Sequence, residues 1–245
     1  MDDDHESHSS YKLLLFDIDG TLIRSAGAGR DAMNRAFRKT YGIRNGFDRI
    51  RMMGRTDPGI LDEVLREHGL KWDDAQVEQF QIHYYHYLEE ELKKPRQGKR
   101  ICAGMDRILP TLKDRPDLML GLLTGNWRYG AYLKLRHFML DDYFTIGAFG
   151  DDSTDRNLLV PVALERFRMQ MRFPVRPENT WVIGDTPFDI QCGKPHCTRT
   201  IGVATGVHTL KELIAEKPDH AFEDFSEVSS LLRLFIPDGE RIPNG

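Results

Sequence analysis

The segment 17–21, which reads Asp-Ile-Asp-Gly-Thr, constrains the fold more than any other stretch of the chain. It directly follows the apolar run 12–16, a pattern typical of a buried strand. In open α/β sheets, ligands bind beyond the carboxyl ends of the strands. Two carboxylates at such a strand end repel each other and need a cation, and all-oxygen ligands favour Mg²⁺. The alternative interpretation is an ordinary Asp-Gly turn.

Two later apolar runs end in a similar way. The run 118–123 is followed by Thr-Gly-Asn at 124–126, and the run 180–183 by Gly-Asp-Thr-Pro-Phe-Asp at 184–189. Thr-Gly-Asn by itself is also a plain turn signal. Three strand ends that carry small or acidic residues in this order are hard to reach by chance.

These segments resemble the motifs of the haloacid dehalogenase-like hydrolases, particularly the phosphoglycolate-phosphatase-like branch with a helical cap. The first motif, Phe-Asp-Ile-Asp-Gly-Thr-Leu at 16–22, is the specific one, and Gly-Val-Ala-Thr-Gly at 202–206 is similar to the family's late strand and loop. The resemblance covers about residues 12–232. It implies an α/β fold, with a Rossmann-like parallel sheet core, helices on both faces and an inserted all-helical cap domain.

The spacing of the motifs supports such an insert. Thr124 lies 107 residues after Asp17, whereas a strand–helix–strand crossover needs about 30 residues. Helical patterns fill the extra length, and we expect cap helices at 31–41, 58–68 and 73–93, the second with Asp57 as its N-cap. The loop-like joins 25–29 and 94–99 predict a lid hinged to the core. The predicted parts are a disordered tail at 1–10, an α/β core at 11–25 and 103–245, and the cap at 26–102.

The core is expected to alternate strands and helices, which indicates a parallel sheet with helices on both faces. The predicted core strands are 118–123, 144–149, 180–183 and 198–203, in addition to the run 12–16. The predicted core helices are 104–114, 128–138, 160–170, 187–194, 209–216 and one near 226–235.

The resemblance implies roles for the carboxylates. Asp17 would be the nucleophile that forms an aspartyl-phosphate, and Asp19 the general acid and base. Mg²⁺ would be bound by Asp17, the backbone carbonyl of Asp19 and Asp185. Asp189 would lie in the outer shell of the metal, or would be a helix N-terminal charge favoured by the helix dipole.

Thr124, with the backbone amides of Gly125 and Asn126, would bind the oxygens of the transferring phosphoryl group. Gly-Arg-Thr at 54–56 precedes a predicted helix N-terminus, which is a natural anion site. Arg55 is therefore expected either to contact an acidic leaving group or to be a simple loop charge.

One part of the family pattern differs in this chain. The family has a lysine between the second and third motifs, yet no lysine lies between Lys134 and Lys194. Arg156 is the nearest suitably placed cation, and Asp-Arg-Asn at 155–157 resembles a variant found in part of the family. Arginine can bridge a carboxylate and a phosphate. The alternatives are that Arg156 is solvated near a helix start, or that Lys194 supplies the charge.

Composition excludes several other classes of protein. The net charge of −4 leaves no electrostatic footprint for nucleic acid, and no apolar run approaches the roughly 18 residues of a membrane helix. The acidic N-terminus is unlike a secretory signal. Cys102, Cys192 and Cys197 are too few for a disulfide framework and indicate a cytoplasmic protein.

His83 and His86 are interpreted as helix surface instead of a metal site.

The predicted function is that of a hydrolase, a Mg²⁺-dependent phosphomonoesterase that acts on a small phosphorylated metabolite, as a monomer or homodimer. Dehalogenating members of the family lack an acid at the position of Asp19, and phosphonate-cleaving members carry a Trp-Ala variant of the first motif. Two alternatives remain open. One is a phosphomutase of the β-phosphoglucomutase type, and the other is a catalytically idle binding protein of the same fold.

Overall fold

The computed structural model describes residues 11–236, so the tail expected at 1–10 lies outside the described residues. The strands are β1 (Lys12–Phe16), β2 (Ile23–Arg24), β3 (Arg100–Ile101), β4 (Leu118–Leu123), β5 (Ile146–Ala148), β6 (Thr180–Gly184), β7 (Arg199–Val203) and β8 (His220–Phe222). The α-helices are α2 (Ala28–Tyr41), α3 (Asp57–Glu67), α4 (Asp74–Lys93), α5 (Met105–Lys113), α6 (Arg128–His137), α7 (Leu159–Met171), α8 (Pro187–Gly193), α9 (Leu210–Ala215) and α10 (Val228–Leu232).

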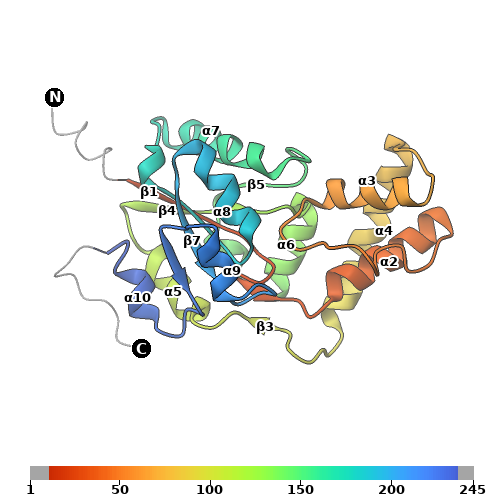
Figure 1. Cartoon of the computed structure of the whole chain (residues 1–245), viewed down its shortest axis with the longest axis horizontal. Helices are drawn as coiled ribbons and strands as arrows, with labels where there is room; N and C mark the ends of the chain where they lie inside the picture. The colour runs from red at the N-terminus through yellow and green to blue at the C-terminus, as the bar shows by residue number, and fades with distance from the viewer. Residues whose placement is uncertain (1–10, 237–245) are drawn as a thin grey trace.

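Six parallel strands form the central sheet, in the order β5-β4-β1-β6-β7-β8 (Figure 1). Strand β1 lies between β4 and β6, and its last residue, Phe16, pairs with Leu122 on one side and Ile183 on the other. The three strands therefore end at nearly the same level. This register places the segments after residues 16, 123 and 184 side by side. The parallel sheet with its connecting helices confirms the predicted α/β fold class.

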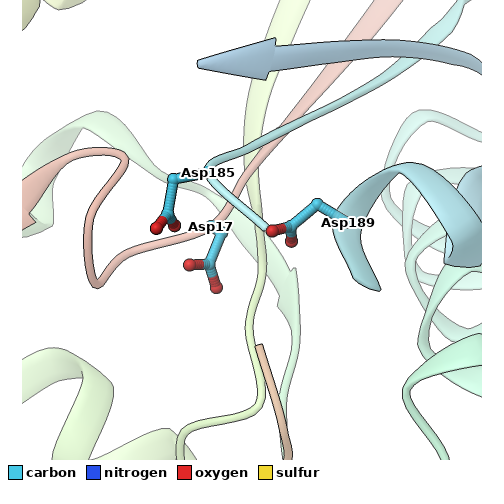
Figure 2. Close-up of side chains that lie close together, drawn as sticks. All are labelled: Asp17, Asp185 and Asp189. Atoms are coloured by element: carbon cyan, nitrogen blue, oxygen red, sulfur yellow. The ribbon is translucent and has the colours of Figure 1, made fainter. Parts of the chain in front are cut away.

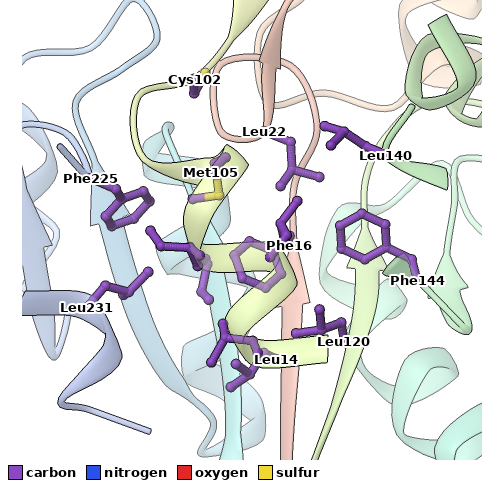
Figure 3. Packing of buried hydrophobic residues seen from close by; sticks show 14 of the residues in the cluster. Leu14, Phe16, Leu22, Cys102, Met105, Leu120, Leu140, Phe144, Phe225 and Leu231 are labelled. Atoms are coloured by element: carbon purple, nitrogen blue, oxygen red, sulfur yellow. The ribbon is translucent and has the colours of Figure 1, made fainter. Parts of the chain in front are cut away.

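Helices cover both faces of the sheet, and the apolar run of β1 is therefore buried on both sides. Leu14 and Phe16 pack in one cluster with α5 and α10 (Figure 3). Leu13 and Leu15 belong to a second cluster, formed with α7 and α8 on the opposite face. The period-two alternation of a strand explains this division.

Helices α2, α3 and α4 form the cap and share their own apolar cluster. On α2 the face turned to this cluster includes Met33, Ala36 and Phe37, which are buried. The predicted N-cap of α3 was wrong by one residue: Thr56 has extended backbone, and its hydroxyl accepts a hydrogen bond from the Gly59 amide at 3.3 Å. Asp57 is instead the first helical residue, which leaves its carboxylate free for other partners.

The two chain crossings between cap and core lie side by side, since β2 and β3 pair as a short antiparallel ribbon. The guanidinium of Arg96 also donates to the carbonyl of Ala26 at 3.2 Å and to Asp31 at 2.7 Å. Hydrogen bonds thus connect the two segments that were predicted as loop-like hinges.

The core helices and strands lie within about two residues of their predicted positions at most ends, with two notable differences. Two predicted elements are shorter, since β5 covers Ile146–Ala148 of the range 144–149, and α10 covers Val228–Leu232 of the helix predicted near 226–235. Strand β8 was not predicted: its three residues are only half buried, so they form no apolar run. Among the described residues, no helix is both long and apolar enough to cross a membrane.

Candidate active site

Three carboxylates gather at the carboxyl edge of the sheet (Figure 2). Asp17 follows β1, Asp185 follows β6, and Asp189 lies in the first turn of α8. Each is buried, and one oxygen from each lies within 4.8 Å of the others. The strand register explains why residues so far apart in the sequence come together.

The electrostatics of this cluster favour a divalent cation. Burial raises the pKa of Asp17 to about 6, against the opposing effect of Arg156. Burial, and then repulsion by Asp17 and Asp189, raise the pKa of Asp185 well above its usual range. Among the described residues, Oδ2 of Asp185 has no hydrogen-bond partner although it is buried. A buried, unpartnered carboxylate oxygen among like charges is the donor set that Mg²⁺ suits.

Glycines make room for Asp185. A Cβ atom on Gly206 would lie 1.6 Å from Oδ2 of Asp185, and one on Gly20 would lie 2.3 Å from the same oxygen. Gly20 also has a φ of 98°, which favours glycine. The glycines of the first motif and of the late loop therefore enclose the carboxylate from two sides.

Asp189 is already committed to protein partners. Its Oδ2 accepts hydrogen bonds from the Thr186 amide at 3.0 Å and from the Thr186 hydroxyl at 2.7 Å, as part of a capping box. Its Oδ1 accepts from Arg156 at 2.5 Å. Oδ2 thus stabilises the start of α8, and Oδ1 binds the guanidinium of Arg156. These contacts favour the helix-terminal interpretation, while the outer-shell role stays a prediction.

Arg156 lies directly beside Asp17. It is buried, and its Nη2 donates to Oδ1 of Asp17 at 3.0 Å and to the Leu123 carbonyl at 3.1 Å. Burial lowers the pKa of Arg156, but the carboxylates of Asp189 and Asp17 more than offset this effect and raise it, so the guanidinium stays charged. Lys194, the alternative cation, is exposed and donates to the Glu216 carbonyl.

The Asp19 carboxylate faces a separate set of donors. Its Oδ2 accepts from Nδ2 of Asn126 at 3.0 Å, and its Oδ1 from the hydroxyl of Ser25 at 3.4 Å. Nδ2 of Asn126 also donates to the hydroxyl oxygen of Thr124 at 2.8 Å. The side chain of Asp19 is therefore held apart from the acidic cluster, next to the residues predicted to bind phosphate.

Lys134 is a site residue that the sequence analysis missed. Its ammonium donates to Oδ2 of Asp19 and to Oδ1 of Asn126, the latter at 2.5 Å, and the side chain is buried. A signal was present in the sequence: Lys134 belongs to the buried stripe of α6 with Gly130 and Ala131, directly after the second motif. A lysine on the buried face of that helix needs a partner.

The cap closes the site from the other side. Asp57 is buried, its amide donates to the Gly125 carbonyl at 2.7 Å, and its Oδ2 accepts from the Trp127 amide at 2.9 Å. Burial raises the pKa of Asp57 to about 7. The guanidinium of Arg156 also reaches the cap, as Nη1 donates to the Gly54 carbonyl at 3.2 Å.

A cavity of about 290 Å³ lies between cap and core. The core side is lined by Asp17, Asp19, Gly125, Asn126, Lys134 and Arg156. The cap side is lined by residues that include Arg30, Met33, Met52, Met53, Arg55, Asp57, Ile60 and Tyr84. Arg55 is thus placed at the cavity, but its guanidinium forms an ion pair with Glu63. Contact between Arg55 and a leaving group stays a prediction.

The two histidines singled out in the sequence lie away from this cavity. Nδ1 of His83 contacts the Thr40 hydroxyl at 3.0 Å, and the exposed His86 pairs with Glu90 at 3.2 Å. Within residues 11–236, the group suited to a metal is the acidic cluster of Asp17, Asp185 and Asp189.

Comparisons with known proteins agree with this arrangement. The profile of the family described as Haloacid dehalogenase-like hydrolase matches residues 14–203. A phosphoglycolate phosphatase from Mannheimia succiniciproducens is 24% identical over 237 residues, which cover 92% of this chain and 100% of that protein. Pyrophosphatase PpaX from Oceanobacillus iheyensis is 23% identical over 236 residues, which cover 91% and 97%.

A solved structure has the same fold. The hydrolase from Pseudomonas syringae is 22% identical and superposes with a TM-score of 0.68, over 92% of this chain and 100% of its own length. The family profile spans most of the chain and includes all three motif segments, so the resemblance seen in the sequence is confirmed. The chain belongs to the haloacid dehalogenase-like hydrolases, and it is an enzyme of the phosphatase type.

Proposed function

We propose that this protein is a Mg²⁺-dependent phosphomonoesterase that acts on a small phosphorylated metabolite through an aspartyl-phosphate. The observation that carries the proposal is the separation of two carboxylates. Asp17 is buried against Arg156 in the acidic cluster, whereas Asp19 is held by Asn126 and Lys134 at the cavity between cap and core. Two carboxylates in different environments suit a nucleophile and an acid–base group.

In the first step, a carboxylate oxygen of Asp17 attacks phosphorus. The bond between phosphorus and the leaving oxygen breaks, and Asp19 gives its proton to that oxygen. In the second step, Asp19 takes a proton from water, whose oxygen attacks phosphorus and displaces Asp17 as a free carboxylate. The products are the alcohol and inorganic phosphate, and both aspartates return to their starting states.

The cations of the site have distinct parts in this scheme. Arg156 keeps Asp17 ionised despite burial and offers its guanidinium to the phosphoryl group. Lys134 positions the carboxylate of Asp19 together with Asn126. Thr124 and the amides that follow it would bind the phosphoryl oxygens.

The unpartnered Oδ2 of Asp185 supports a metal at this site. Asp17, Asp185 and the backbone carbonyl of Asp19 would hold it. When bound, Mg²⁺ would offset the repulsion between the attacking carboxylate and the phosphate dianion.

A phosphatase screen with and without Mg²⁺ tests the proposal. We expect turnover of phosphomonoesters and of an aryl phosphate, loss of turnover in EDTA, and a phosphoryl group covalently attached at Asp17 after rapid acid quench. The panel includes phosphoglycolate and pyrophosphate, after the names of the two relatives. Undiminished turnover in EDTA would contradict the metal, and a requirement for a sugar bisphosphate would identify a mutase instead.

A further inference from the structure

Tyr84 on α4 has a buried hydroxyl that makes no hydrogen bond within residues 11–236. The side chain is fully buried and lines the cavity between cap and core. Its ring stacks on Phe80 at 6.3 Å between centroids and lies 5.8 Å from the ring of Trp127. Packing therefore fixes the direction of the hydroxyl, and a buried hydroxyl without a partner is costly unless a ligand supplies one.

The position of the hydroxyl relates it to the reaction. A Cβ atom on Gly130 would lie 3.6 Å from it, so the hydroxyl lies over the first turn of α6. Lys134 is one turn further along that helix and binds Asp19, the group proposed to protonate the leaving oxygen. Burial, with the nearby charges of Asp57 and Asp19, raises the pKa of Tyr84 well above its usual range, so the phenol remains a donor. A leaving group that takes its proton from Asp19 would lie on the same side of the cavity as this donor.

Two of the arginines around this part of the cavity, Arg30 and Arg55, already donate to protein groups. Arg30 donates to the carbonyls of Asp48 at 2.9 Å and Ile50 at 3.0 Å. Arg55 is paired with Glu63. Arg24 lies on an exposed position at the rim, in β2. A second negative charge on the substrate would thus compete with protein groups for the donors of Arg30 and Arg55.

The remaining cap wall is apolar and adaptable. Met33, Met52, Met53 and Ile60 line the cavity. Methionine side chains are flexible and pack against varied carbon skeletons. Such a wall favours carbon atoms over charged oxygens.

We propose that Tyr84 is a specificity-determining residue, and that the substrate is the phosphomonoester of a small uncharged alcohol with a hydrogen-bond acceptor for Tyr84 and a carbon skeleton for the methionine wall. This inference rests on the proposed phosphatase function. It distinguishes the protein from the relatives named for phosphoglycolate and pyrophosphate, since the leaving groups of those substrates carry charge.

Four substrates test the inference in the unaltered protein. Glycerol 1-phosphate and propyl phosphate share a three-carbon skeleton, and only the first has further oxygen acceptors. Phosphoglycolate and pyrophosphate have charged leaving groups. We expect kcat/KM to be highest for glycerol 1-phosphate, lower for propyl phosphate, and lowest for the two charged substrates.

Tyr84→Phe removes only the hydroxyl. We expect it to lower the ratio of kcat/KM for glycerol 1-phosphate to that for propyl phosphate about threefold to tenfold, the size of one hydrogen bond. Tyr41→Phe is the matched control, because the hydroxyl of Tyr41 is also buried without a partner in the described residues but does not line the cavity. That variant should keep the ratio of the unaltered protein.

A higher kcat/KM for phosphoglycolate or pyrophosphate than for both three-carbon esters would overturn the inference and leave the phosphatase function standing. An unchanged ratio in Tyr84→Phe would overturn the role of Tyr84. The substrate order in the unaltered protein tests the charge argument even if Tyr84→Phe fails to fold. No turnover of any ester, including an aryl phosphate, would overturn the proposed function and this inference together.

Discussion

The core and the cap contribute to the site in different ways. The core supplies Asp17, Thr124 and Asp185 from loops at the ends of three adjacent strands, so backbone hydrogen bonds of the sheet determine their positions. The cap supplies Asp57 and Tyr84 from helices α3 and α4, which are packed together through the apolar cluster of the cap. In the proposed mechanism, reaction chemistry thus depends on the rigid sheet, while substrate choice is left to the more easily altered helical layer.

The two parts are also joined more closely than a hinged lid requires. Trp127 precedes α6 in the core, yet its indole is buried in the apolar cluster of the cap. The cap residue Asp57 accepts a hydrogen bond from the amide of the same tryptophan. The loop that is predicted to bind phosphate therefore also leads into the contact with the cap. Four substitutions test how far this contrast between core and cap extends.

Asp17→Asn should produce the largest effect. The amide keeps the shape of the side chain but cannot attack phosphorus, so we expect kcat to fall at least about a thousandfold. Steady-state kinetics with an aryl phosphate measure this, and circular dichroism checks that the fold is kept. Near-normal turnover would show that the nucleophile lies elsewhere.

Trp127→Ala should mainly separate cap from core. Removing a buried indole is expected to cost about 3–5 kcal/mol of the free energy of unfolding, measured by urea denaturation. Trp72→Ala is the control, because Trp72 is 41% exposed and should change stability little. Equal costs for the two variants would mean that the cap does not depend on the core tryptophan.

Lys134→Met tests a positioning role in the core. Loss of the ammonium removes a donor to the carboxylate of Asp19, and we expect kcat to fall about tenfold to a hundredfold. Lys211→Met, on the exposed surface of α9, should leave kcat unchanged. A kcat of Lys134→Met close to that of the unaltered protein would contradict the positioning role.

Asp57→Asn tests the buried charge in the cap, and its expected effect is the smallest. The pKa of Asp57 is about 7 in the folded protein and about 3.9 in an unfolded chain. The folded state therefore binds more protons between these values, so the stability of the unaltered protein falls as the pH rises from about 4 to about 7. Asparagine does not titrate and can still accept from the Trp127 amide.

We expect the advantage of Asp57→Asn in unfolding free energy to grow by about 1–3 kcal/mol across that pH window and then level off. Urea denaturation at pH 4, 5.5, 7 and 8.5 measures it. Asp142→Asn, at an exposed position, should show no such trend. A constant difference between Asp57→Asn and the unaltered protein would refute the buried-charge interpretation.

The sequence by itself determined most of the core. Apolar runs mark the strands locally, and each chemical motif is attached to the end of one run, so Asp17, Thr124 and Asp185 could be assigned before their neighbours were known. Arg156 could be proposed from its place between motifs, and the structure puts it against Asp17. Helical periodicity likewise located the three cap helices to within a few residues at their ends.

The tertiary structure decided what the helices present to the site. Lys134, Asp57 and Tyr84 belong to no strand-end motif, and similar residues are found on any amphipathic helix. The contacts of these side chains depend on which helix face is buried and on which distant loop packs against it. Lys134 donates to Asp19, and Asp57 accepts from the amide of Trp127. Local pattern determines where a chain is helical or extended, but the partners of a buried polar side chain are set only when separate elements pack together.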